Sequence, residues 1–185
     1  MYENFLLFCI TFCYLIPIFI IWYNYSNNNS LSSIICDDKF KNIVFISFLA
    51  MGFFTIIYEY QRKDPISLVI ILILLANIYC LIFVNEKMYM HYLFATAAFL
   101  SILFFCFWHF YKNSQTDILF LLAISQLFFF ILTAMNSNNE NIFIYEVFFL
   151  INFAVYYLYL HTVTIVSENI ITMDENLVIK LNNND

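Results

Sequence analysis

The chain has 185 residues, of which 64% are hydrophobic and only 11% are charged, with 7 Lys and Arg against 13 Asp and Glu. A typical soluble domain is about 45–50% apolar and about 25% charged, and a chain of this size still leaves roughly 30% of its surface exposed. This composition excludes a water-soluble globule, a largely disordered chain and a nucleic-acid-binding protein, which needs a positive surface. A multi-pass membrane protein remains.

Six apolar segments follow one another along the chain. A helix needs about 20 mainly apolar residues to cross a hydrocarbon core of about 30 Å. The predicted spans cover residues 5–23, 43–58, 66–84, 90–111, 118–135 and 142–166. The second span is the shortest and contains Ser47, Gly52 and Thr55. The tail over residues 167–185 is polar and acidic, and we expect it to be solvated and partly disordered.

These segments are expected to be helices. Strands of a membrane barrel would alternate apolar and polar residues, whereas the run ISLVIILILLANIYCLIFV is apolar on every face. A cleaved signal peptide is the alternative for the first span, but no basic residue precedes it and no small-x-small cleavage site follows. Short loops make neighbouring spans antiparallel. The predicted fold class is therefore an all-α bundle of six transmembrane helices.

Basic residues and glycosylation sequons indicate the orientation. With the N-terminus inside, four basic residues are cytoplasmic and three are outside. The sequons at Asn24 and Asn28 both lie in the loop over residues 24–42, which this topology places outside. We predict cytoplasmic termini and candidate glycosylation at Asn24 and Asn28. Either an endomembrane or the plasma membrane fits the sequence.

Ionisable residues at membrane depth are the default candidates for a site, because burying them is costly. Glu59 lies at the inner end of the second span, and we expect an interfacial ion pair with Arg62 and Lys63 at i+3 and i+4. Glu146 lies about one turn inside the sixth span, and His91 opens the fourth span on the same outer side. The two form a candidate intramembrane polar pair; the alternative is two separate interfacial residues.

The sequence offers few residues that could form a catalytic site. His109 and His161 end the fourth and sixth spans on the inner side, so these two side chains can meet. A catalytic zinc site, however, needs three converging ligands, and a single Gly excludes a glycine-rich nucleotide loop. We therefore predict no catalytic, metal or cofactor-binding residues and no enzymatic activity.

The remaining polar residues of the spans form faces on single helices. They are Asn77 in the third span, Gln126 and Thr133 in the fifth, and Asn152 and Tyr156 in the sixth. Either these faces seal the interior of the bundle by hydrogen bonds or they line an aqueous path. In the fourth span we expect the small Ala98 to lie at a helix interface and Leu103 to face lipid.

Several residues give the chain a resemblance to a known family. They are Ala76-Asn77-Ile78 in the third span, then Asn85, His91, Ala95 and Ala98, and Glu146 near the start of the sixth span. In these features, and in its six short-looped spans, the chain resembles the damage-regulated autophagy modulator family. The resemblance implies a non-enzymatic modulator of endomembrane or plasma-membrane behaviour.

Two functions follow as hypotheses. The first is a non-enzymatic membrane protein that acts through membrane lipids or other membrane proteins as partners. The second is a small transporter or channel subunit that uses the polar faces of the fifth and sixth spans.

Overall fold

The computed structural model describes residues 2–23, 31, 34, 39–85, 87–112, 117–135 and 142–182, and the side chains of the last helix as far as residue 162. In this part of the chain there is no strand. The six long helices are α1 (Tyr2–Tyr23), α3 (Lys41–Gln61), α4 (Pro65–Phe83), α5 (Tyr89–Lys112), α6 (Asp117–Met135) and α7 (Ile142–Asn182). The predicted all-α class is confirmed. Asn24 and Asn28, the candidate glycosylation sites, lie outside the described residues.

Each of these helices is long and apolar enough to cross a membrane. The shortest have 19 residues, and at about 1.5 Å per residue such a helix nearly matches the thickness of the hydrocarbon core. The ends of the first five helices lie within a few residues of the predicted spans. The helix α3, for example, includes polar residues at both ends that the hydropathy of the span alone leaves out. The chain is an integral, multi-pass membrane protein.

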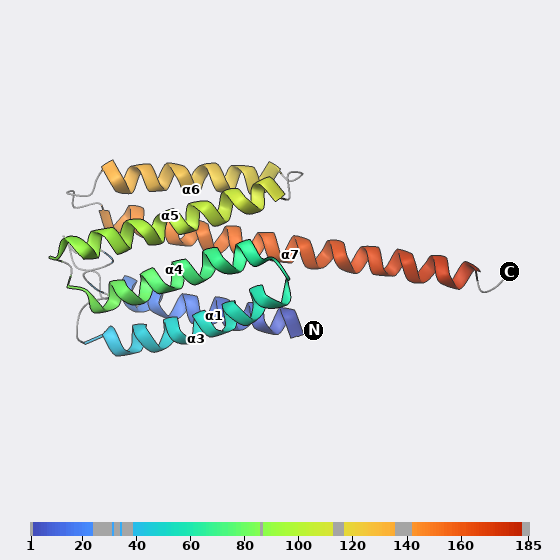
Figure 1. Cartoon of the computed structure of the whole chain (residues 1–185), viewed down its shortest axis with the longest axis horizontal. Coiled ribbons are helices and arrows are strands. Elements are labelled where there is room, and N and C mark those ends of the chain that lie inside the picture. Colours follow the sequence, from blue (N-terminus) through green and yellow to red (C-terminus); the bar gives the residue numbers. More distant parts are fainter. Residues whose placement is uncertain are drawn as a thin grey trace.

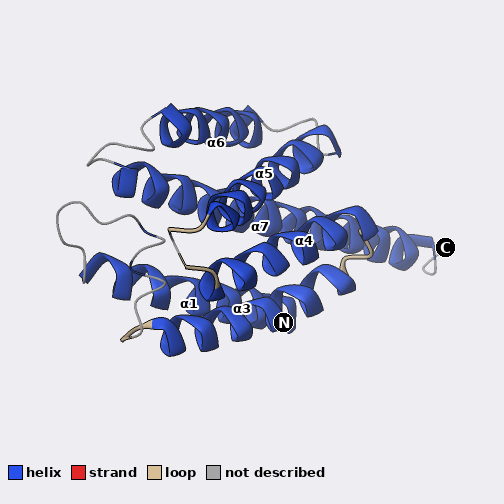
Figure 2. Ribbon diagram, turned by 60° about the vertical axis from the view of Figure 1, so that its left-hand side comes forward, coloured by secondary structure: helices blue, strands red, loops and turns tan. Residues whose placement is uncertain are grey.

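Consecutive helices run antiparallel, so that both ends of the chain lie at the same end of the bundle (Figure 1). The most extensive packing joins α1 to α3, α4 to α5 and α6 to α7. Figure 2 shows α6 against α5 and α7, on the side of the bundle away from α1 and α3. The location of both termini on the cytoplasmic side of a membrane stays a prediction.

The last helix continues far beyond the other five (Figure 1). The expected partly disordered tail is helical as far as Asn182 in the structure. The sequence offers a physical reason, because the apolar residues Ile170, Met173, Leu177 and Leu181 follow one another at intervals of three or four residues, which is helical spacing.

The buried core draws on every helix, and on α5 and α7 the side chains of Phe105, Cys106, Phe149 and Tyr156 are inaccessible to solvent. Ala98 of α5 is also buried, which agrees with the expected helix interface. Leu103, which we expected to face lipid, is also buried, and that prediction was wrong. The reason is the position of α5, which packs against α4, α6 and α7 and so buries more than one of its faces.

A close approach of α3 and α4 occurs at Gly52, the only glycine of the chain. A Cβ atom at this position would lie 2.5 Å from the hydroxyl oxygen of Tyr79 and 3.2 Å from Cδ2 of Leu75. The same Tyr79 hydroxyl donates a hydrogen bond to the carbonyl oxygen of Phe48, at 3.2 Å. Glycine thus permits both the close packing of the helices and the hydrogen bond between them.

The substitution Gly52→Leu should separate α3 from α4 and displace the Tyr79 hydroxyl. Overpacking of this kind costs about 1–3 kcal/mol of the free energy of unfolding, which thermal unfolding in detergent would detect. The matched control is Thr96→Leu, which introduces the same side chain at an exposed position of α5. Equal stability of the two variants would contradict the close approach at Gly52.

Candidate functional site

A buried polar cluster lies at the end of the bundle that carries both termini. It consists of Glu59 of α3, Ser67 of α4, His109 of α5, and Tyr157 and His161 of α7, and is called the Glu59 cluster below. All five side chains are buried, and those of Glu59, Ser67 and His161 are completely inaccessible. The cluster thereby brings four helices together around one carboxylate.

Both carboxylate oxygens of Glu59 receive hydrogen bonds from hydroxyl groups on other helices. The Ser67 hydroxyl donates to Oε2 at 2.7 Å, and the Tyr157 hydroxyl donates to Oε1 at 2.8 Å. Nε2 of His161 lies 3.3 Å from Oε1, within the distance of an ion pair but outside the geometry of a hydrogen bond. The carboxylate is therefore held from α4 on one side and from α7 on the other.

The contact between Ser67 and His109 decides what the cluster can do chemically. Nε2 of His109 lies 3.1 Å from the Ser67 Oγ. Because a carboxylate only accepts hydrogen bonds, the Ser67 proton points to Glu59, and His109 must be the donor in its contact with Ser67. A serine nucleophile needs the opposite arrangement, in which the histidine accepts the serine proton. This arrangement holds the Glu59 carboxylate in place and does not activate Ser67 as a nucleophile.

Aromatic rings enclose the two imidazoles. The His161 ring meets the rings of Tyr58 and Tyr157 edge to face, with centroids 4.8 and 4.2 Å apart. The centroids of His109 and His161 are 6.4 Å apart, so the two histidines do meet, as their positions in the sequence allowed. Nδ1 of each imidazole is buried without a hydrogen-bond partner. These two atoms, unlike Nε2 of His161, also lack a contact with the Glu59 carboxylate.

The expected ion pair of Glu59 with Arg62 and Lys63 is not formed. The helix α3 ends at Gln61, and Lys63 adopts a left-handed conformation with φ of 57°. Lys63 therefore leaves the helical path, whereas Arg62, the C-cap residue, keeps α-helical dihedral angles and a backbone hydrogen bond to Tyr58. The Arg62 guanidinium instead lies 5.9 Å from the centroid of the Tyr58 ring.

A second anchor lies next to the Glu59 cluster, at Asp64 in the turn between α3 and α4. The Asp64 carboxylate caps α4 by accepting hydrogen bonds from the backbone N–H groups of Ile66 and Ser67, at 3.2 and 3.1 Å. It also accepts from Trp108 Nε1 at 3.2 Å and from Lys112 Nζ at 2.8 Å, both on α5. The Asp64 side chain thus caps the N-terminus of α4 and links α4 to α5.

The surroundings of Asp64 lower the pKa of its carboxyl group. Burial alone would raise the pKa, but the hydrogen bonds from Lys112, from the Ser67 backbone and from Trp108 outweigh it and hold the pKa at about 2. Asp64 is not among the residues predicted for a site, although the sequence carries a signal for it. Aspartate followed by proline is a typical start of a helix, with Asp64 as the N-cap and Pro65 in the first turn.

At the opposite end of the bundle, the candidate pair of His91 and Glu146 is not joined by a hydrogen bond. Glu146 Oε2 accepts from the backbone N–H of Leu31 at 2.8 Å, and His91 Nδ1 donates to the carbonyl oxygen of Val84 at 3.1 Å. Nε2 of His91 is buried without a hydrogen-bond partner. Each side chain instead bonds to nearby backbone, Glu146 to Leu31 and His91 to the end of α4.

The predicted polar faces of α6 and α7 meet each other. Gln126 Nε2 donates to the carbonyl oxygen of Phe149 at 3.0 Å, and Asn152 Nδ2 donates to the amide oxygen of Gln126. Tyr156 donates to the carbonyl oxygen of Cys106 on α5, at 2.6 Å. These contacts match the interpretation of a bundle interior sealed by hydrogen bonds.

The two other predicted polar residues bond within their own helices. Asn77 Nδ2 donates to the carbonyl oxygen of Ile73, and Thr133 Oγ1 donates to that of Phe129. Neither hydrogen bond joins two helices, so the structure does not bring Asn77 and Thr133 together with the Gln126–Asn152 pair.

Among the described residues, no group of three or more His, Cys, Asp or Glu side chains is arranged to hold a metal ion. Comparison with known proteins adds no relative, since no protein-family model, curated protein or solved structure matches the chain. The fold and the contacts define the class of the protein, a six-helix integral membrane protein with a buried carboxylate–imidazole cluster at one end.

Asp64 contributes to stability both as the cap of α4 and through its ion pair with Lys112, and two substitutions separate these contributions. Asn also caps helices well, so Asp64→Asn should keep the cap and lose the ion pair with the half-exposed Lys112, at a cost of about 0.2–1 kcal/mol. Asp64→Ala should lose the cap as well, which adds about 0.5–2 kcal/mol. The free energy of unfolding in detergent measures both.

The pH dependence of the Asp64→Asn effect has a definite sign. The pKa of Asp64 is lowered in the folded protein, so its charged form stabilises the fold above the ordinary pKa of 3.8. This stabilisation is lost as the pH falls toward 2 and the carboxylate is protonated. The difference between wild type and Asp64→Asn should therefore shrink between pH 4 and pH 2. A difference that grows on acidification would contradict the assigned hydrogen bonds.

Proposed function

We propose that the protein is a non-enzymatic multi-pass membrane protein that acts through bilayer lipids or partner membrane proteins. The observation that carries this proposal is the use of the polar groups inside the spans. Gln126, Asn152 and Tyr156 bond to neighbouring helices, and Ser67 bonds to Glu59. Polar side chains that hold helices together are a known means of stabilising membrane bundles, and they leave the outer surface as the place of interaction.

The outer surface is strongly apolar. Large side chains on different helices are more than half exposed, among them Phe12, Phe53, Phe104, Leu121 and Phe128. In a bilayer these side chains contact lipid tails or other membrane proteins. The resemblance to the damage-regulated autophagy modulator family, drawn from Asn77, His91 and Glu146, belongs to the same proposal and rests on the sequence.

A small transporter or channel subunit is the second candidate, and one observation favours it. Glu59, His109 and His161 are ionisable residues within membrane-crossing helices, and such residues often mark ion or proton paths. The unpaired Nδ1 atoms of the two histidines give the cluster sites that can accept or donate a proton. The support for this candidate comes from the Glu59 cluster rather than from the polar faces of α6 and α7.

Flux measurements separate the two candidates. The purified protein is reconstituted into liposomes that contain a pH-sensitive dye, and a potassium gradient with valinomycin drives proton movement. We expect the wild type, Glu59→Gln and the control Glu146→Gln to match protein-free vesicles. Glu146 suits this control because it is a buried carboxylate at the other end of the bundle. Proton flux that Glu59→Gln abolishes and Glu146→Gln retains would overturn the proposal in favour of the transporter.

A further inference from the structure

The Glu59 cluster contains a continuous chain of hydrogen bonds in which Ser67 is the middle member. The Ser67 Oγ atom lies 2.7 Å from Oε2 of Glu59 and 3.1 Å from Nε2 of His109. A serine hydroxyl has a single proton to donate and lone pairs that accept. Ser67 can therefore donate to only one of its two neighbours at a time, and the other neighbour must donate to Ser67.

Two arrangements of the protons satisfy this chain. In the first, Glu59 is ionised, Ser67 donates to its carboxylate, and the Nε2–H group of His109 donates to Ser67. In the second, Glu59 is a carboxylic acid whose O–H group donates to Ser67, and Ser67 donates to an unprotonated Nε2 of His109. A neutral His109 then carries its proton on Nδ1. The charge of Glu59 thus determines the tautomer of His109.

One added proton converts the first arrangement into the second. The proton binds to Nδ1 of His109, the Nε2–H bond breaks as its proton passes to Ser67 Oγ, and the former hydroxyl proton of Ser67 passes to Oε2 of Glu59. His109 and Ser67 are neutral before and after, and Glu59 gains the proton. Nδ1 of His109 has no hydrogen-bond partner to displace, and His109 lies three residues before the end of α5, about 4.5 Å along the helix axis. His109 is therefore the member of the chain at which a proton can enter.

The proton comes to rest on Glu59, because His161 is poorly placed to hold it in an ion pair. Glu59 is completely buried, and Nε2 of His161 lies 3.3 Å from Oε1, outside the geometry of a hydrogen bond. A buried ion pair offsets the cost of desolvation only when its geometry is good. A neutral carboxylic acid, in contrast, leaves no charge in the cluster.

Other charged or titratable groups lie around the cluster. Among the described residues they are Tyr58 and Arg62 of α3, Asp64 of the following turn, Lys112 of α5, Tyr157 of α7, and Glu3 of α1, which acts on Tyr58. Asp64, with its pKa of about 2 and its bond to Lys112, stays ionised while the cluster takes up its proton. Glu3 is the remaining carboxyl group of this set, and a control variant below removes it.

We propose that the Glu59 cluster binds one proton, which reaches Glu59 through His109 and Ser67 and weakens the link between α3 and α7. The link weakens because a hydrogen bond to an ionised acceptor is roughly twice as strong as one to a neutral acceptor, and Tyr157 of α7 donates to Glu59 of α3. Proton uptake thereby loosens α7, the helix that continues beyond the other five (Figure 1). The proposal goes beyond the proposed function, because it gives the cluster a regulatory role at the end of the bundle that carries the termini.

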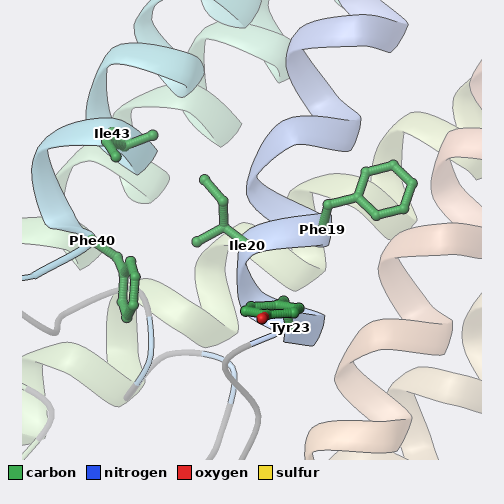
Figure 3. A pocket seen from close by; sticks show the side chains of 5 residues that line it. All are labelled: Phe19, Ile20, Tyr23, Phe40 and Ile43. Carbon is green, nitrogen blue, oxygen red and sulfur yellow. The ribbon is translucent and has the colours of Figure 1, made fainter.

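The bound proton has no continuation toward the opposite end of the bundle. Among the described residues of α3, α4, α5 and α7, the next acidic or histidine side chains in that direction are His91 and Glu146. His91 lies eighteen residues from His109 on the same helix, about 27 Å away at the rise of an α-helix. The apolar groove between α1 and α3 at that end adds no carboxyl, imidazole or amino group, since it is lined by Phe19, Ile20, Tyr23, Phe40 and Ile43 (Figure 3). The site therefore agrees with the absence of proton flux that the proposed function expects.

Nitrogen NMR of the full chain, with 15N-labelled histidine in detergent micelles, reads the tautomer of His109 directly. The protein is titrated from about pH 9 to about pH 3, a range that includes the ordinary pKa values of His and Glu, and the His109 signals are those missing in His109→Gln. Before proton uptake we expect the proton on Nε2, and after uptake of the first proton we expect it on Nδ1. A first step that turns His109 into an imidazolium, or a tautomer that stays unchanged throughout, would overturn the proposal.

Further variants test the path of the proton. Glu59→Gln, which removes the proton acceptor, and Ser67→Ala, which removes the connecting hydroxyl, should both abolish the change of tautomer, whereas Ser67→Thr keeps a hydroxyl and should retain it. The matched control is Ser101→Ala, which removes a buried serine hydroxyl that bonds within α5. Glu3→Gln is the control for the neighbouring carboxyl group, and both controls should retain the change. A change of tautomer that persists in Ser67→Ala would overturn the path through Ser67.

Tyr157→Phe tests the link between the two helices. Its loss of thermal stability relative to the wild type, measured in detergent, should fall to about half once the cluster has taken up its proton. A loss that is equal on both sides of the titration step, or larger on the acidic side, would overturn the proposed weakening of the link.

Failure of this proposal is distinguishable from failure of the proposed function. An unchanged His109 tautomer with no Glu59-dependent flux overturns the proton site alone. Glu59-dependent flux overturns the proposed function whether or not the tautomer changes.

Discussion

A carboxylate buried at the end of a membrane-crossing helix is tolerated only when other groups donate hydrogen bonds to both of its oxygens, because neither water nor lipid replaces them there. Glu59 meets this condition with Ser67 of α4 and Tyr157 of α7, and Ser67 in turn contacts His109 of α5. Three helices must therefore approach α3 in a fixed register. The helix α3 packs extensively on α1 and α4 but not on α7, so the hydrogen bond from Tyr157 is an important link between α3 and α7.

The two ends of the bundle differ in the contacts that hold the helices together. At the end that carries the termini, the Glu59 cluster and Asp64 close the bundle with hydrogen bonds between α3, α4, α5 and α7. At the other end, α1 and α3 leave an apolar groove, and the Glu146 carboxylate accepts its hydrogen bond from the backbone of Leu31.

The sequence predicted the spans well because length and hydropathy decide which segments cross a membrane. It predicted polar partners less well, since these depend on helix rotation and on loop backbone. The spacing of Glu59 to Arg62 and Lys63 indicated an ion pair, but α3 ends before both of them. His91 and Glu146 have partners from backbone segments whose positions no periodicity specifies. The meeting of His109 and His161 was predictable, because both end their spans on one side and α5 and α7 are close.

The central claim is that the hydrogen bond from Tyr157 to Glu59 joins α7 to α3. A double-mutant cycle of Glu59→Gln and Tyr157→Phe, read as free energy of unfolding in detergent, tests it most directly. Hydrogen bonds to charged groups contribute about 1.5–3 kcal/mol, so we predict a coupling energy of about that size. Tyr159→Phe, which removes a hydroxyl from a nearby tyrosine of the same helix, should show no coupling to Glu59→Gln. Additive losses for Glu59→Gln and Tyr157→Phe would contradict the account.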